Sequence, residues 1–150
     1  MKRSQRLQII IDLQQRQENE ALQLLGRRQQ QLNEQQAQLD NLLNYRQQYL
    51  NKLLERQKTG MNVNQLLELR AFADKLDKAI EGQRLTVRQQ ERECQKARDK
   101  WQESHQRSKS LLRLGEIAVA EETQLEIKRE QSEQDARAAR SSRKDGANNA

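Results

Sequence analysis

Apolar residues recur through the second half of the chain in alternating steps of three and four. That spacing is the heptad pattern of a coiled coil, with apolar residues at positions a and d. The series runs from Leu66 to Leu125. Cys94 and Trp101 both fall on it, so packing in a helical seam accounts for each of them. We therefore predict a long helix over residues 64–140 that packs against a second helix.

The first half carries a similar but less regular seam, which predicts a helix over residues 4–58. With Ile11 at position a, most a and d positions are Leu, Ile or Ala, and polar residues interrupt them. The seam is weakest around Arg28 and Gln35. In that stretch we expect the register to drift toward Leu22, Leu43 and Leu50.

The segment between the two patterns has the chemistry of a tight turn, predicted over residues 59–63. Gly60 suits the left-handed position that ends a helix, and Lys58 lies in the last turn, where the helix dipole favours cations. Asn62 is a good N-cap, with Gln65 as its capping-box partner. A loop this short makes the two helices antiparallel neighbours. Residues whose numbers add to about 122 should then lie opposite each other.

Composition supports a coiled coil over a compact globule. Hydrophobic residues make up 33% of the 150 residues, aromatic residues 3% and charged residues 33%. This is too little apolar material for a globular core, but a coiled coil buries only two positions in seven. Proline is absent and the apolar residues are periodic, which argues against disorder. The predicted fold is all-α: one antiparallel coiled-coil hairpin over residues 1–140 whose second helix is the longer.

The far end of the second helix has no partner in this arrangement beyond about residue 118. Its sequence there, EETQLEIKREQSEQDARAAR, is polar, and residues 141–150 are expected to form a disordered tail. The net charge is +6, and the nearest approach to a basic patch is Arg137, Arg140, Arg143 and Lys144. Interspersed charge of this kind favours a solvated surface, so we expect no nucleic-acid partner.

No pattern for catalysis or ligand binding accompanies the heptads. His105 has no acidic or Cys partner at metal-ligand spacing, and the five Gly residues form no phosphate loop. We expect no enzyme activity, no metal and no cofactor. The longest aliphatic run, residues 9–11, is far too short for a signal peptide or a membrane span. We expect a cytoplasmic protein without direct membrane insertion.

The aromatic residues suggest a surface for a protein partner. Tyr45, Tyr49 and Phe72 all lie near the turn, and Tyr45 and Phe72 are not seam positions. The pairing rule places them in one neighbourhood, where aromatic rows are favoured interface anchors. An alternative is that these side chains only thicken the core near the turn. The predicted set is Gln38, Leu42, Tyr45, Tyr49, Phe72, Leu76 and Ala79.

Several segments, in order and with matching spacing, resemble the flagellar export protein FliJ family. They are RLQIIIDLQQRQENEALQLLG at the N-terminus, YRQQYLNKLLERQKTG and FADKLDKAIEGQ around the turn, and Trp101 followed by REQSEQDARAAR. The resemblance implies a component of the flagellar type III export apparatus that forms an antiparallel coiled coil similar to the stalk of rotary ATPases. It implies three partners: the hexameric export ATPase (FliI), the cytoplasmic domain of the export gate protein (FlhA), and export chaperones that the protein escorts.

The resemblance also assigns roles to the two ends. It implies that the surface near the turn binds the gate and that the end carrying both termini enters the ATPase ring, at the inner membrane below the flagellum. Because a stalk meets its ring through charged contacts, Arg6, Arg16, Lys128 and Arg129 are candidates for the ATPase contact. Two alternatives remain at this point: the equivalent stalk protein of a virulence secretion system, and a generic structural coiled-coil scaffold.

Overall fold

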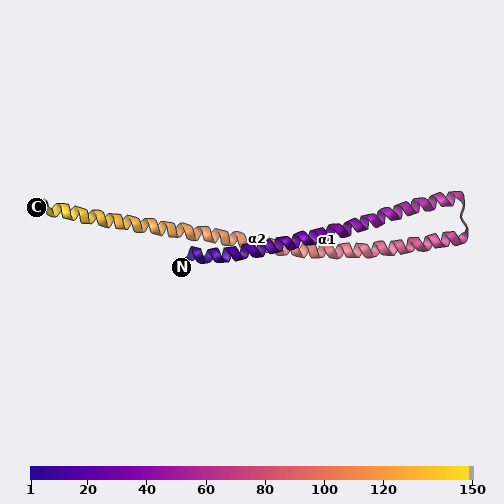
Figure 1. Ribbon diagram of the computed structural model, residues 1–150, viewed down its shortest axis with the longest axis horizontal. Coiled ribbons are helices and arrows are strands. Elements are labelled where there is room, and N and C mark those ends of the chain that lie inside the picture. The colour runs from indigo at the N-terminus through magenta and orange to yellow at the C-terminus, as the bar shows by residue number, and fades with distance from the viewer. Residues whose placement is uncertain (149–150) are drawn as a thin grey trace. The chain divides into compact units, whose positions relative to one another are not determined.

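The computed structural model describes residues 1–148 and contains two helices in that range (Figure 1). Helix α1 spans Arg3–Thr59 and helix α2 spans Val63–Asn148. The described residues include no β-strand. The antiparallel all-α hairpin with a longer second helix, predicted from the heptads, is confirmed.

The turn forms through the residues that the sequence indicates. Gly60 has a φ of 95°, the left-handed conformation that ends a helix and that costs glycine little. Asn62 caps α2: its Oδ1 accepts a hydrogen bond from the Gln65 backbone N–H at 2.8 Å. Arg56 and Lys58 lie in the last turn of α1. A left-handed stop followed at once by an N-cap reverses the chain within three residues, from 60 to 62.

The chain divides into two compact units, which we describe separately. The turn unit is Glu18–Glu103, and the terminal unit combines Met1–Gln17 with Ser104–Ala150. In each unit a part of α1 lies beside a part of α2. In the turn unit Gln35 bonds to Gln83, and Gln29 contacts Cys94. The numbers of these pairs add to 118 and 123, close to the predicted value of 122.

The predicted heptads describe the packing of α1 well. Every a and d position from Leu7 to Leu53 is buried or half-buried. Of the three residues toward which the register was expected to drift, Leu22 stays 48% exposed, whereas Leu43 packs against the core cluster and Leu50 is half-buried. Hydrogen bonds between polar seam residues explain why Leu22 stays outside the seam. Gln83 donates from Nε2 to the backbone oxygen of Gln35 at 2.9 Å and to its Oε1 at 2.8 Å. A paired amide is tolerated in the seam, so the register does not need to shift.

The apolar core of the turn unit consists of large aliphatic residues. Leu39, Leu76, Ile80 and Val87 form one buried cluster. Cys94 continues this seam at 4% exposure, and its Sγ donates to Gln29 Oε1 at 3.3 Å. This half of the hairpin is therefore held by ordinary hydrophobic burial.

The seam of the terminal unit combines small residues with Leu7, Ile11 and Leu111, of which Ile11 is the most deeply buried. Ile11 is buried, as are Ser108 and Ala118. Opposite Ile11 stands Gly115, where an added Cβ would lie 2.8 Å from Ile11 Cδ1. The glycine therefore makes room for the isoleucine.

Polar contacts complete the terminal unit. Gln14 donates from Nε2 to the Ser104 Oγ at 3.0 Å and to the Ser104 backbone oxygen at 3.2 Å. At the start of α1, Ser4 donates to Glu122 twice, from its backbone N–H at 3.0 Å and from its Oγ at 2.6 Å. The carboxylate thus caps a free N–H in the first turn of α1 from the neighbouring helix.

Beyond Glu122, α2 continues alone within the terminal unit, past the start of α1 (Figure 1). All side chains from 123 to 147 are exposed, including Leu125, the last predicted seam position. The helix does not end at the predicted residue 140 but reaches Asn148, because no proline interrupts it and Arg and Ala favour helix. Residues 149–150 of the expected tail lie outside the described residues. The predicted division into a domain over residues 1–140 and a tail over residues 141–150 stays a prediction.

Candidate partner-binding surfaces

The aromatic residues near the turn share one flank of the helix pair. In an antiparallel pair the symmetry axis runs across the helices, so position g of one helix lies on the same side as position g of the other. Tyr45 and Gln38 are g positions of α1, and Phe72 and Ala79 are g positions of α2. Four of the seven residues predicted for this surface therefore lie on one flank of the turn unit.

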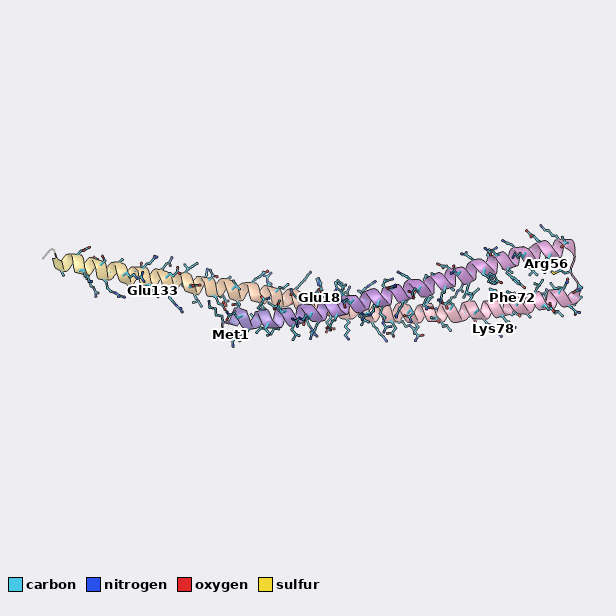
Figure 2. The ribbon with its side chains drawn as sticks, viewed as in Figure 1. Met1, Glu18, Arg56, Phe72, Lys78 and Glu133 are labelled. Carbon is cyan, nitrogen blue, oxygen red and sulfur yellow. The ribbon has the colours of Figure 1, made fainter. Side chains whose placement is uncertain are left out.

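The three aromatic rings contact one another across the two helices. The Tyr49 and Phe72 ring centres lie 4.8 Å apart, and Tyr45 meets Phe72 edge to face at 6.3 Å. Tyr49 donates from its hydroxyl to the Leu69 backbone oxygen at 2.9 Å. Figure 2 labels Phe72 on α2. These contacts fix Phe72 in a defined orientation before any partner arrives, which lowers the entropic cost of binding.

The cluster is only partly covered. Tyr45 is 51% and Phe72 39% exposed. Beside them lies a shallow depression lined by Gln38, Asn41, Leu42 and Tyr45. Asn41 is a residue that sequence reasoning missed, because a lone polar side chain outside the seam carries no pattern. An exposed aromatic pair beside a shallow depression has the form of an interface anchor.

The predicted set also contains residues that the structure places inside the seam. Leu76 is buried in the core cluster, and Leu42 packs against that cluster. Both are d positions, so their side chains point toward the partner helix. The depression, the ring contacts and the core cluster thus join six of the seven residues, Ala79 shares only the g flank with them, and Leu76 has no surface of its own. Its part in any interface is to support the exposed side chains.

Burial raises the pKa of Tyr49 above its ordinary value of 10.0, and the neighbouring Tyr45 raises it further while Arg56 lowers it. A Tyr that is harder to ionise keeps its proton under physiological conditions. The hydroxyl therefore remains a donor to Leu69, and the aromatic cluster keeps its geometry.

An ion pair joins the two helices of the turn unit away from the g flank. Arg46 Nε and Asp77 Oδ1 form an ion pair at 2.6 Å between the helices, and both side chains are more than 40% exposed. A pair so open to water contributes little stability. The exposed aromatic rings of the turn unit, those of Tyr45 and Phe72, lie on the g flank.

The four arginine and lysine candidates for an ATPase contact all lie in the terminal unit, and all are exposed. Arg6 and Arg16 lie on the part of α1 that packs against α2. Lys128 and Arg129 lie on the part of α2 beyond Glu122, where the helix has no partner. The structure does not gather the four into one cluster with a single function.

Other kinds of site find no support among residues 1–148. That range contains no group of three His, Cys, Asp or Glu residues placed to hold a metal ion. Over the same residues, neither helix has a stretch apolar and long enough to cross a membrane.

A comparison with protein families gives one result. The model of the family described as "Flagellar FliJ protein" matches residues 2–147, nearly the whole chain. Curated proteins and solved structures yield no significant match to this chain.

Proposed function

The chain belongs to the flagellar FliJ family and is a component of flagellar type III protein export, and from this premise we propose that it acts as a stalk between two partners. One partner is the export gate protein, bound by the surface near the turn. The other is the export ATPase ring, which takes up the terminal unit. The protein also escorts export chaperones, and it works in the cytoplasm at the inner membrane below the flagellum.

The observation that carries this proposal is the aromatic cluster on the g flank. Tyr45 and Phe72 are half-exposed, held against Tyr49, and adjacent to a shallow depression. Ring contacts between the helices can stabilise the hairpin, but they do not require Tyr45 and Phe72 to remain half-exposed beside a depression. Aromatic anchors at partly open positions supply much of the affinity in protein interfaces.

The family match favours the flagellar reading over a virulence secretion system, because the matched description names the flagellar protein. That family is a non-catalytic export component, so the function proposed here is one of contact and assembly. A generic scaffold remains the competing function, and binding measurements separate the two.

The test is a binding titration of the full chain with the cytoplasmic domain of its cognate gate protein and, separately, with the export ATPase. The variant is Tyr45→Ala with Phe72→Ala. We expect gate affinity to fall at least about 10-fold, because truncating anchor residues costs that much or more, while ATPase affinity is unchanged. Circular dichroism checks that the variant stays helical.

A matched control removes exposed apolar side chains elsewhere in the same unit. Leu22→Ala with Leu85→Ala serves, since both leucines are exposed and lie off the g flank. This control should bind the gate as the wild type does. Equal losses in both variants would show a general effect of apolar surface, and a wild-type chain that binds neither partner would leave only the scaffold.

A further inference from the structure

The terminal unit has exposed apolar side chains that neither its seam nor the aromatic cluster explains. Ile9, Ile10 and Leu13 on α1, with Leu114 and Ile117 on α2, are each between 44% and 59% exposed. Single exposed leucines are common on protein surfaces, but a group of five on so small a unit is not. Sequence reasoning treated residues 9–11 only as a run too short for a membrane.

Heptad geometry places these five side chains on one face. Ile10 and Leu114 are g positions, so they lie on the same flank of the antiparallel pair. Leu13 and Ile117 are the adjacent c positions, and Ile9 is the next position outward, f. Ile11 and Gly115, which contact each other, bring the neighbouring Ile10 and Leu114 to nearly the same level along the unit. We call this group the apolar face.

The apolar face is surrounded by positive charge. We compared the c, f and g positions of residues 2–17 and 107–124, which form this side of the unit. The one carboxylate among them is Glu121. The cations there are Lys2, Arg3, Arg6, Arg16, Arg107 and Arg113.

The other side of the same unit differs in charge. Its b and e positions over the same residues carry two carboxylates, Asp12 and Glu116, and one lysine, Lys109. Two apolar residues, Leu112 and Val119, are also exposed there. Exposed apolar area is therefore found on both sides, but only one side combines it with a strongly basic rim.

The basic rim restricts what can cover the face. A second copy docking face to face would set arginines against arginines, which is unfavourable. A membrane-bound helix needs an apolar stripe along much of its length, whereas the apolar face occupies only residues 9–13 of α1, about 1.4 turns. A protein surface with an apolar centre and carboxylates around it matches both the apolar group and the rim.

We propose that the apolar face, with its arginine rim, is the contact surface through which the terminal unit binds a protein partner with an apolar, acid-rimmed surface. This rests on the proposed function, in which that partner is the export ATPase ring. The contact with the ATPase ring is then mainly apolar and not only charged. The five aliphatic side chains supply most of the affinity, while Arg6, Arg16 and Arg113 steer the approach of the partner and set the salt dependence of binding.

The test titrates the full chain with the cognate export ATPase. The variant Ile10→Ser with Leu114→Ser removes the centre of the face, and we expect affinity to fall at least about 10-fold. The matched control, Leu112→Ser with Val119→Ser, removes equally exposed aliphatic side chains from the other flank and should change affinity less than about 2-fold. Circular dichroism verifies that both stay helical.

The rim is tested by salt. Arg6→Gln with Arg113→Gln leaves the aliphatic side chains in place and should flatten the dependence of affinity on sodium chloride. A salt dependence equal to that of the wild type would overturn the role given to the rim.

Three results would overturn the contact surface itself. If the wild type binds the ATPase and the Ile10→Ser, Leu114→Ser variant binds equally well, the face is not the contact and the proposed function stands. If the wild type binds only the gate domain, the ATPase part of the proposed function fails as well. If the wild type sediments as a dimer, or binds phosphatidylglycerol vesicles, and this variant alone loses that property, the face serves a second copy or a membrane.

Discussion

The turn unit and the terminal unit use the same heptad pattern but distribute their bulk differently. In the turn unit Leu39, Leu76 and Ile80 form a buried cluster, although other leucines of the unit, such as Leu22 and Leu85, are exposed. In the terminal unit the seam has small residues such as Ser108, Gly115 and Ala118, and the leucines and isoleucines next to it are exposed. The turn unit therefore has a buried aliphatic cluster that holds its helices together, while the terminal unit carries a group of exposed aliphatic side chains on one face, accessible to a partner.

This difference suggests a way to read other coiled coils. A heptad count identifies the seam, but the volume of the seam residues and the apolar residues outside the seam indicate where a partner binds. Where large apolar side chains occupy positions c, f and g instead of a and d, they are not buried between the two helices. Their burial can then stabilise association with a partner. The following experiments test the comparison, from the largest expected effect to the smallest.

Core truncation should separate the two units most clearly. Leu76→Ala, in the buried cluster of the turn unit, should lower the free energy of unfolding by about 2 to 5 kcal/mol. Leu114→Ala, on the exposed face of the terminal unit, should lower it by less than about 1 kcal/mol. Urea denaturation followed by circular dichroism measures both. If both variants lose a similar free energy of unfolding, the two leucines are equally buried in solution, and the difference drawn between the two units is wrong.

Two mid-helix glycines of α2, Gly82 and Gly115, provide an intermediate effect. Gly82→Ala, in the turn unit, meets no atom within 4 Å and should stabilise the protein by about 0.5 to 1 kcal/mol through helix propensity. Gly115→Ala gains the same propensity but places its Cβ against Ile11 Cδ1. Overpacking should make it about 1 to 3 kcal/mol less stable than Gly82→Ala, again by urea denaturation.

A second substitution checks the cause. Ile11→Val removes the Cδ1 methyl, so Gly115→Ala should be less harmful in the Ile11→Val background than in the wild type. Equal costs in both backgrounds would assign the effect of Gly115→Ala to something other than this contact.

The smallest effect concerns the start of α1. The hydrogen bonds from Ser4, first from its hydroxyl and then from its backbone N–H, hold the pKa of Glu122 below its ordinary value of 4.5. Because the folded state favours the carboxylate, this contribution to stability is present above pH 4.5 and is lost as the pH falls through the lowered pKa. The first turn of α1 should then fray in acid.

Backbone amide NMR of residues 4–7 over this pH range measures the fraying. The Glu122→Gln variant cannot ionise at this position and should show no transition from this source. The turn unit lacks the Ser4 contact, so its amides serve as an internal reference. If the amide signal of Ser4 changes with pH in Glu122→Gln as it does in the wild type, protonation of Glu122 is not the cause of the fraying.

The sequence predicted the helices and the turn because each depends on local chemistry. Gly60 and Asn62 act within a few residues, and the steps of three and four need only one helix at a time. The aromatic neighbourhood was also within reach, because the short turn fixes the pairing of Tyr45 with Phe72. That the surface near the turn and the candidate ATPase residues bind partners stays a prediction.

What the sequence did not show depends on two helices taken together. Ile10 and Leu114 form one face only when the flanks of both helices are compared. The room that Gly115 leaves for Ile11, and the capping of Ser4 by Glu122, are likewise steric and hydrogen-bonding facts across the seam. The burial of Leu76 was implied by its d position, yet the aromatic neighbours drew it into the predicted surface.

The burial of Cys94 gives the protein a built-in reporter. It is the chain's one cysteine, and its sulfur lies in the seam of the turn unit at 4% exposure. A bulky thiol reagent reaches it only while α1 and α2 are apart at that point. The labelling rate therefore measures how often this part of the hairpin opens, on the unmodified chain and with any partner bound.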